Sequence, residues 1–489
     1  MFEAPAIDWF VILPFVIVAG SGILLMVVDL FVADEQRAWA PWLTIVGLFA
    51  ALAVSVSQWG MAGATFTAVG DAPMIVVDNF AVFLNVTLLL AGILSLLISL
   101  NFLEDANLNK PEYHMLMLFS LSGMMLMGMS NDLILIFVAL ELLSIPLYIL
   151  SGIAWPNVKS EESALKYFLL GAFSSSIFVF GIALTYGASG STSLPLIVAR
   201  ISLNSALGIG AMAFILVGLA FKVAAAPFHM WTPDVYEGAP TTVTAFMSVG
   251  AKVAGFAALL RILMVAFPYV GDAWVGALAI LATLTLIIGN VVAIAQTNIK
   301  RMLAYSSIAH AGYILIAVAA SANSPDGVGA ALFYMMAYLF SNLGAFAIVI
   351  AMEKRDDQGV LLDDYKGLWQ RSPAMALAMV VFMLSLAGIP PTGGFVGKLF
   401  VFRTAVEANL TWLAVVGVVT AVVSTFYYLR VVYLMFMFEG EAEINAKPAL
   451  RTAVVVMVLV TFLIGLLPGA WFELARQAGL SGLPLLAGG

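Results

Sequence analysis

The chain has 489 residues, of which 63% are hydrophobic and 10% are charged, and its mean hydropathy is +1.08. This composition excludes a soluble globular protein, because a soluble core could not bury so much apolar surface, and it predicts an integral membrane protein. The net charge of -8 is spread over the polar connections and does not indicate a nucleic-acid partner. The chain has no cysteine, and its three histidines lack metal-ligand spacing, so we expect no disulfide and no metal site.

The apolar segments are long enough to cross a bilayer as helices, which takes roughly 20 residues each. They lack the short alternating strands of a membrane barrel, so we expect an all-α polytopic membrane protein with about fourteen transmembrane helices. The first segment, MFEAPAIDWF, carries acidic residues but no lysine or arginine, so we expect no cleaved leader before it. The expected spans are residues 9–32, 41–59, 76–100, 113–128, 133–153, 163–189, 207–226, 241–267, 273–295, 302–320, 328–352, 375–402, 410–438 and 449–467.

The seventh span contains a lysine and then a helix break, in the stretch GLAFKVAAAPFHMWTPDVYEGAPT. Lys222 ends a long uncharged run, and Pro227 lacks the amide that would continue the helix. Irregular backbone at membrane depth is tolerated where it is buried in protein or lines a cavity, so this stretch is a candidate ion path. A simple proline kink with a lysine that reaches the interface is the alternative.

The twelfth span has a similar break, in MLSLAGIPPTGGFVGKLFVF, where Lys398 follows Pro390 and Pro391. Spans four to eight and nine to thirteen form two blocks of five, and the broken helix is the fourth in each. Because five is odd, the second block would start on the opposite side, which predicts two inverted five-helix repeats, each with a discontinuous helix. We therefore divide the chain into residues 1–110 (helices one to three), 111–268 (first repeat), 269–440 (second repeat) and 441–489 (helix fourteen).

The positive charges of the connections favour one side of the membrane. Eleven lysines and arginines fall in one set of alternate connections and three in the other, so we place the first set in the cytoplasm and both termini outside. The first set is Arg37, Lys110, Lys159, Lys300, Arg301, Lys354, Arg355, Lys366, Arg371, Lys447 and Arg451, and the second is Arg200, Arg403 and Arg476.

Five ionisable residues lie within expected spans, namely Glu141, Lys166, Lys222, Lys252 and Lys398. Each costs roughly 2.5 to 3.5 kcal/mol at a helix centre, so such residues are expected to face the interior of the bundle and to pair. Lys166 is close to the start of its helix and by itself suits an interface anchor. However, Lys166 is in the sixth span and Glu141 is in the fifth, and because these spans are neighbours we expect the two residues to form an ion pair.

Lys222 and Lys252 are the expected proton carriers. Burial and a nearby cation both disfavour the charged form of a lysine, so this pair is expected to release and rebind protons near neutral pH. His229 and His310 are candidate proton relays, although a lone histidine at a helix end is more often a packing residue. Arg261 and Arg430 lie nearer the span ends, and we interpret both as structural.

Four stretches resemble the antiporter-like membrane-arm subunits of respiratory complex I, the proton-translocating NADH:quinone oxidoreductase, and specifically subunit N. They are AFKVAAAPFHMWTPDVYEGAPT with Lys252 after it, VALELLSIPLYIL with Glu141, EESALKYFLLGAFSSS with Lys166, and AGIPPTGGFVGKLFVF with Lys398. The resemblance covers the whole chain, and PFHMWTPDVYEGAP together with the short C-terminal extension favours subunit N over its sister subunits.

The resemblance implies roles for these residues and for the partners. Glu141 and Lys166 would form a modulating ion pair, Lys222 the central protonatable site, Lys252 a connecting lysine and Lys398 the terminal lysine. The subunit would be a non-redox part of a translocase, with no cofactor of its own. NADH, FMN, iron–sulfur clusters and quinone would belong to partner subunits, which include the sister antiporter-like subunits, and lipids would surround it. The lack of an arginine-rich transit peptide fits the bacterial cytoplasmic (inner) membrane, with an organelle-encoded protein as the alternative. The charge pattern places both termini of this multi-pass protein on the periplasmic side.

Two other functions fit the composition and the charges. The first is a sodium/proton antiporter subunit that is not driven by redox chemistry. Its expected composition and charge placement match those of a complex I subunit, and only the sequence motifs distinguish the two. A structural membrane anchor, in which the lysines act as struts, is disfavoured by five buried charges and two broken helices.

Overall fold

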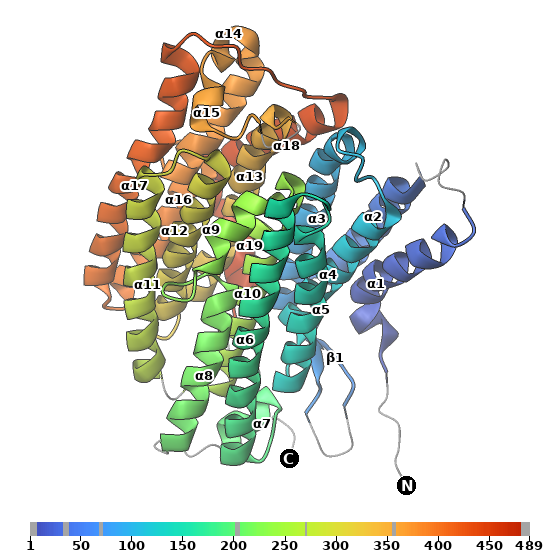
Figure 1. The fold of residues 1–489 in the computed structure, drawn as a ribbon. Coiled ribbons are helices and arrows are strands. Elements are labelled where there is room, and N and C mark those ends of the chain that lie inside the picture. Colours follow the sequence, from blue (N-terminus) through green and yellow to red (C-terminus); the bar gives the residue numbers. More distant parts are fainter. Residues whose placement is uncertain are drawn as a thin grey trace.

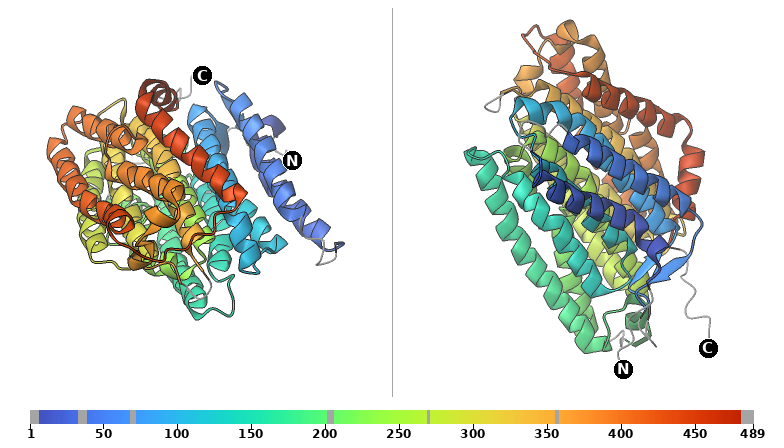
Figure 2. Two further views of the ribbon diagram at one scale, coloured as in Figure 1. Left: turned by 90° about the horizontal axis from the view of Figure 1, so that it is seen from above. Right: turned by 90° about the vertical axis from the view of Figure 1, so that its right-hand side faces the viewer.

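The computed structural model of the chain describes residues 7–32, 39–67, 72–200, 206–268, 271–354 and 358–480. Long helices lie side by side in one bundle, as seen from three directions in Figures 1 and 2. Arg37, Arg355 and residue 269, where the second repeat is predicted to begin, lie outside the described residues.

The first part of the chain contains the helices before the first break and one small hairpin. Its elements are α1 (Trp9–Asp29), α2 (Ala40–Ser57), β1 (Gly63–Thr65), β2 (Ile75–Val77), α3 (Asn79–Asp105), α4 (Pro111–Met129), α5 (Leu133–Ser151), α6 (Val158–Ser189), α7 (Leu194–Arg200) and α8 (Ala206–Lys222). Strands β1 and β2 are antiparallel, with Gly63 opposite Val77 and Thr65 opposite Ile75.

The second part contains the two broken spans and the C-terminal helices. Its elements are α9 (Trp231–Gly238), α10 (Thr241–Arg261) with a π-helical turn (Ile262–Ala266), α11 (Gly271–Ile294), α12 (Ile299–Ala320), α13 (Gly327–Met352), a 3-10 turn (Leu362–Tyr365), α14 (Leu368–Arg371), α15 (Pro373–Ala387), α16 (Gly393–Glu407), α17 (Thr411–Met437), α18 (Pro448–Leu466) and α19 (Pro468–Gln477).

Eleven helices of the described chain are long and apolar enough to cross a membrane, so the protein is a multi-pass membrane protein. The three other expected spans coincide with α4, with α8, and with α15 and α16 together. Helices α8 and α15 have only 17 and 15 residues, because the chain breaks after each of them. The sixth span begins at Val158, five residues before the predicted start, since Asn157 caps the helix through hydrogen bonds to two amides.

The bundle has an inner group of helices and an outer group. In α13 every residue is buried, and α3, α10 and α12 are nearly as enclosed. Helices α1, α2, α6 and α18 are only one-third buried and present apolar side chains outward. The inner helices therefore provide the protein-lined interior in which buried charges are tolerated.

Both ends of the described chain lie at the end of the bundle that carries the β hairpin (Figure 1). The amide of Asp8 donates to Thr65 in the hairpin, and Asn79 at the start of α3 donates to the carbonyl of Gln477 at the end of α19. At the opposite end, Lys110, Lys300 and Lys354 surround one cavity. These lysines all come from the connections that the charge pattern assigns to a single side.

Both breaks leave backbone groups that side chains satisfy. Between α8 and α9, the amide of Ala226 donates to Thr285 at 2.8 Å, and the indole of Trp231 donates to the carbonyl of Phe221 at 3.0 Å. Between α15 and α16, the amide of Gly394 donates to the hydroxyl of Ser385 at 3.1 Å. Pro227 lies in the first break and Pro390 and Pro391 in the second, where the sequence predicts them.

Candidate functional site

Lys222 is the last residue of α8, and its side chain points into the bundle. Its ammonium donates to the hydroxyl of Ser144 on α5 at 2.8 Å and lies 5.7 Å from the ring centre of Tyr167. The side chain is only 3% exposed. The helix break lets the chain turn away after Lys222, so the ammonium is held by one hydroxyl and one aromatic face rather than by a carboxylate.

Glu141 lies one turn before Ser144 on α5 and accepts a hydrogen bond from Ser175 on α6 at 2.5 Å. Ser144, Ser175 and Lys222 line one small cavity of about 10 Å³, close to the minimum that holds a water molecule. Ser175, which binds Glu141, and Ser144, which binds Lys222, therefore line the same cavity.

The predicted ion pair between Glu141 and Lys166 is wrong. The ammonium of Lys166 instead lies 2.7 Å from Asp234 on α9 and 2.7 Å from Glu162 one turn earlier on α6. Glu141 contacts α6 at Ser175, nine residues beyond Lys166, and nine residues of helix rise by about 14 Å. Helices α5 and α6 are neighbours as expected, but Glu141 and Lys166 lie at different depths along them.

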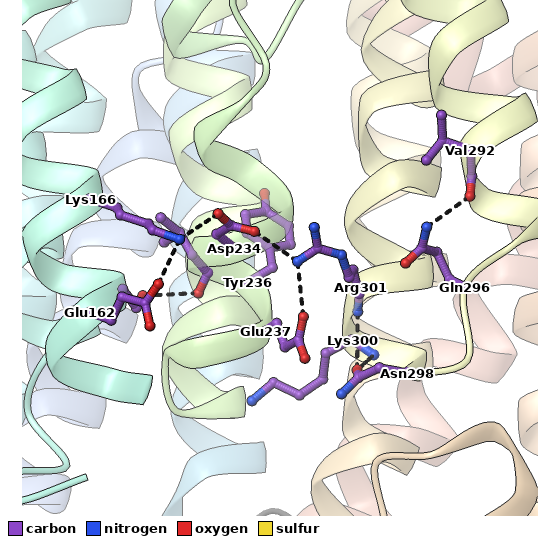
Figure 3. Close-up of polar contacts among 12 residues, drawn as sticks. Glu162, Lys166, Asp234, Tyr236, Glu237, Val292, Gln296, Asn298, Lys300 and Arg301 are labelled. Carbon is purple, nitrogen blue, oxygen red and sulfur yellow. Dashed lines mark hydrogen bonds and ion pairs between the residues drawn. The ribbon is translucent and has the colours of Figure 1, made fainter. Parts of the chain in front are cut away.

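A wider ion network surrounds Lys166, as shown in Figure 3. Asp234 uses its second oxygen to accept from Arg301 on α12 at 2.8 Å, and Arg301 also contacts Glu237 at 3.0 Å. The Lys166 side chain is 41% exposed and that of Arg301 31%. The network joins α6, α9 and α12 and lies nearer the surface of the bundle than the buried lysines.

Lys252 on α10 is 3% exposed and donates to both the carbonyl and the hydroxyl of Ser307 on α12. The hydroxyl of Ser307 also accepts from Tyr338 on α13 at 2.8 Å. Lys222 approaches the same helix α10, since a Cβ placed on Gly255 would lie 3.4 Å from its Cγ. Lys222 therefore packs against α10 within one turn of Lys252.

Lys398 is 4% exposed and contacts the second break directly. Its ammonium donates to the carbonyls of Leu386 at 3.0 Å and Ala387 at 2.9 Å, which are freed where α15 ends. It also lies 4.6 Å from the ring centre of Tyr313 on α12. The break thus supplies the hydrogen-bond acceptors of this buried cation.

His310 lies between the Lys252 and Lys398 sites on α12. Its two ring nitrogens bond to the hydroxyls of Tyr334 at 2.8 Å and Tyr428 at 3.1 Å. Ser307, His310 and Tyr313 follow one another at intervals of three residues, so they share a side of α12. Ser307 contacts Lys252 and Tyr313 contacts Lys398, so these three residues lie between the two lysines. The predicted relay position of His310 therefore falls within a polar row.

His229 lies in the connection between α8 and α9 and is half-buried. Within the described chain, no hydrogen bond joins it to the buried lysines. Of the two predicted relay histidines, the structure brings only His310 into the row.

The two interior arginines have structural partners. Arg261 is fully buried, donates to both oxygens of Asp78 at 3.0 Å and to the carbonyl of Gly128, and joins α10 to the start of α3. Arg430 donates to the carbonyls of Ile294 and Gln296 at the end of α11.

Several residues that complete the site were not predicted. Ser144, Ser307, Tyr334 and Tyr428 are hydroxyl groups in apolar helices, where such residues are common and bear no distinguishing spacing. Asp234 had a usable signal, since it is an acidic residue directly after a helix break. Among the described residues, no group of three or more histidine, aspartate or glutamate side chains forms a metal site.

Comparisons with known proteins identify the family. Residues 130–424 match the family model described as NADH:quinone oxidoreductase/Mrp antiporter, TM. The NADH-quinone oxidoreductase subunit N of Chloroflexus aggregans is 45% identical over 97% of this chain and 98% of its own length. The subunit N of Trichlorobacter lovleyi is 44% identical over 96% of each chain.

Solved structures agree with the sequence relatives. A chain of respiratory complex I from Thermus thermophilus with bound aureothin superposes with a TM-score of 0.82 at 36% identity, covering 95% of this chain and all of that chain. A chain of the Mrp complex from Dietzia sp. has a TM-score of 0.84 at 22% identity, covering 95% and 97%, and shows the same fold. The chain therefore belongs to the subunit N family of NADH-quinone oxidoreductase, within the NADH:quinone oxidoreductase/Mrp antiporter membrane proteins.

Proposed function

We propose that this chain is the antiporter-like membrane subunit of a proton-pumping NADH:quinone oxidoreductase and moves protons along a central row of buried lysines. Lys222, Lys252 and Lys398 each lie at most 4% exposed in the interior of the bundle, and their ammonium groups contact hydroxyls or freed carbonyls. Buried lysines without a carboxylate partner are costly as struts but suited to gaining and losing protons. This arrangement is the observation on which the proposal rests.

The order of transfer follows the polar row. The stem of Lys222 packs against α10 at Gly255, three residues from Lys252. Lys252 leads through Ser307, His310 and the tyrosine hydroxyls to the site of Lys398. Glu141 acts on Lys222 through Ser175 and Ser144. Quinone reduction in partner subunits would supply the energy, and this subunit would need no NADH, flavin, iron–sulfur cluster or quinone of its own.

The topology belongs to the same proposal. All fourteen expected spans cross the membrane, and the blocks 111–268 and 269–440 are inverted repeats whose fourth helices are broken. In support, helix breaks with a buried lysine occur in both blocks. The protein lies in the bacterial inner membrane, with both termini periplasmic and sister antiporter-like subunits beside it.

Lys398 variants test the proposal in membrane vesicles that contain the whole complex. Lys398→Ala should reduce proton pumping per NADH severalfold while the complex still assembles. Lys398→Arg should not restore pumping, because an arginine side chain keeps its proton and cannot act as a relay. Lys366→Ala is the control, since Lys366 pairs with Asp363 in a surface connection. Full pumping in Lys398→Arg would show a strut instead.

A sodium/proton antiporter subunit is the second candidate, and the fold shared with the Mrp chain favours it. Purification in mild detergent separates the two functions. A complex I subunit should co-migrate with NADH dehydrogenase activity, whereas an independent antiporter should not.

A further inference from the structure

A cavity of about 770 Å³ lies at the end of the bundle opposite the β hairpin. The ends of α3, α9, α12 and α13, the connection between α5 and α6, and the segment before α18 all contribute to its wall. Its charged lining residues are balanced in sign, and they are Asp105, Lys110, Lys300, Glu353, Lys354 and Glu443. We call this cavity the vestibule.

The floor of the vestibule contains a buried charged pair. The ammonium of Lys300 lies 3.6 Å from the carboxylate of Glu353, and their side chains are 2% and 6% exposed. Lys300 also donates at 2.8 Å to the carbonyl of Ala239, at the end of α9, and Figure 3 shows its side chain extending from α12. The second carboxylate oxygen of Glu353 is buried and has no hydrogen-bond partner among the described residues. An acceptor oxygen is thus available where solvent meets the interior.

A line of hydroxyl groups leads from this floor to Lys252. Pro240 lines the vestibule, and α10 begins at the next residue. Thr241, Thr244, Ser248 and Lys252 follow at intervals of three, four and four residues, so they occupy one side of α10 over about 16 Å. All four are buried.

The hydroxyl line is supported by polar neighbours. Thr244 donates to the carbonyl of Tyr236 at 3.1 Å, and Asn342 on α13 donates to the hydroxyl of Ser248 at 2.6 Å. The hydroxyl of Thr241 and the amide oxygen of Asn342 are buried and have no partner among the described residues. Buried polar groups of this kind need a hydrogen-bond partner, and water can supply it between the hydroxyls of the line.

We propose that the vestibule is the proton-uptake chamber of this subunit, that Glu353 accepts the proton, and that the hydroxyl line of α10 delivers it to Lys252. This inference rests on the proposed proton pumping. A proton passes from solvent to the carboxylate of Glu353. Successive hydroxyls of the line have Cβ atoms about 5 to 6 Å apart, so water between them completes the path, and each hydroxyl or water accepts one proton on a lone pair and releases another. The last hydroxyl protonates the neutral amine of Lys252, and Glu353 returns to the carboxylate. Lys300 is a positioning residue that holds Glu353 beside the start of α10.

Two substitutions test this route in vesicles that contain the whole complex. Ser248→Ala should lower the pumping rate roughly fivefold, equivalent to the loss of about 1 kcal/mol for one hydrogen bond, and Ser248→Thr should restore it. Glu353→Gln should lower pumping comparably, and Glu353→Asp should retain part of it. Ser122→Ala is the matched control, since Ser122 and Ser248 both bond to the carbonyl three residues earlier, at 2.8 Å and 2.7 Å.

A cysteine plug tests the chamber without changing the polar groups. Ile444 lines the vestibule and is partly exposed, and the natural chain has no cysteine. In inside-out vesicles, a bulky impermeant thiol reagent should slow pumping by Ile444→Cys and leave Gln358→Cys unaffected.

The outcomes separate this inference from the proposed function. If Lys398→Ala lowers pumping but Ser248→Ala and Glu353→Gln leave the pumping rate unchanged, the vestibule route is overturned and the lysine row stands. An equal loss in Ser122→Ala would also overturn the route, because the loss would then reflect packing. If Lys398→Ala pumps normally, the proposed function itself fails.

Discussion

Lys166 and Asp234 form an ion pair of 2.7 Å between α6 and α9. The pair attaches the short helix that follows the first break to the long helix beside it. Because Asp234 also binds Arg301, one carboxylate holds cations from both halves of the chain. The counter-ions of Lys166 are therefore Asp234 and Glu162 rather than Glu141.

Removing the Asp234 charge should affect pumping more than stability. Asp234→Asn leaves Lys166 and Arg301 without their shared counter-ion, so we expect a severalfold lower pumping rate in vesicles. The free energy of unfolding should fall by only about 1 kcal/mol or less, since both ion pairs are partly exposed. Glu162→Gln is the control, because it removes the other partner of Lys166 and leaves Asp234 in place. Similar pumping in the two variants would contradict a special role for Asp234.

Glu141 and Lys166 should behave as independent sites. Glu141 bonds to Ser175, and Lys166 lies at a different depth, so the losses from Glu141→Gln and Lys166→Met should add within about 0.5 kcal/mol in a double-mutant cycle of the pumping rate. Recovery of pumping in the double variant would instead show that the two side chains meet during turnover.

Gly388 should be intolerant of a side chain because of Lys398. Gly388 has a φ of +86°, and a Cβ there would lie 2.8 Å from Cδ of Lys398. Gly388→Ala should therefore displace the lysine and reduce pumping severalfold. Gly190→Ala provides the same backbone strain, at a φ of +69°, with no atom within 4 Å of its Cβ. It should lose about 1 kcal/mol of stability and keep its pumping rate. Equal pumping in the two variants would rule out the contact with Lys398 as the cause.

Arg261 should be a stability residue. Arg261→Met leaves the carbonyl of Gly128 without this donor and Asp78 without its counter-ion, although Asp78 keeps the hydrogen bond from the amide of Ala81. Breaking a fully buried pair costs about 3 to 5 kcal/mol, and the cost here should be lower because Asp78 is 26% exposed. We expect a clear drop in the thermal unfolding temperature of the detergent-solubilised complex. Arg430→Met, which loses two longer hydrogen bonds to carbonyls, should cause a smaller drop. The reverse order would contradict the assignment.

The proposed orientation predicts which introduced cysteines a thiol reagent outside the cell can label. A cysteine at Gln358 should be shielded from an impermeant thiol reagent outside intact cells, whereas one at Asn323 should react. Asn323 is chosen because it is exposed, while its neighbour Ser324 is 4% exposed and donates to Glu407. The opposite labelling pattern would reverse the orientation.

The sequence predicted the helices and both breaks well, because hydropathy and proline act locally along the chain. The expected segments all contain helix, and α8 and α15 end where lysine, glycine and proline residues predict it. The buried state of Lys222, Lys252 and Lys398 followed from the same reasoning, since each lies in an uncharged run.

Partnerships across helices were less predictable. Glu141 and Lys166 lie on neighbouring helices, but their relative depth depends on where α6 begins, and Asn157 starts that helix five residues early. The partners of Lys398 are backbone carbonyls, which exist at every residue and are freed only by the three-dimensional course of the break. The vestibule combines six separate parts of the chain, so no local pattern could indicate it.

The complete burial of α13 has a consequence for the assembly of the bundle. Helix α13 packs against α3, α10 and α12, which precede it, and against α15, α16 and α18, which follow it. When α13 enters the bilayer during synthesis, the faces of α13 that later contact α15, α16 and α18 are still covered by lipid. Lipid tails are as apolar as those helices, so close packing rather than hydrophobicity has to displace them, as where Gly344 admits the ring of Phe382. A chain interrupted before α18 would therefore keep α13 in contact with lipid, and the interior would become free of lipid only once synthesis of the last spanning helix is complete.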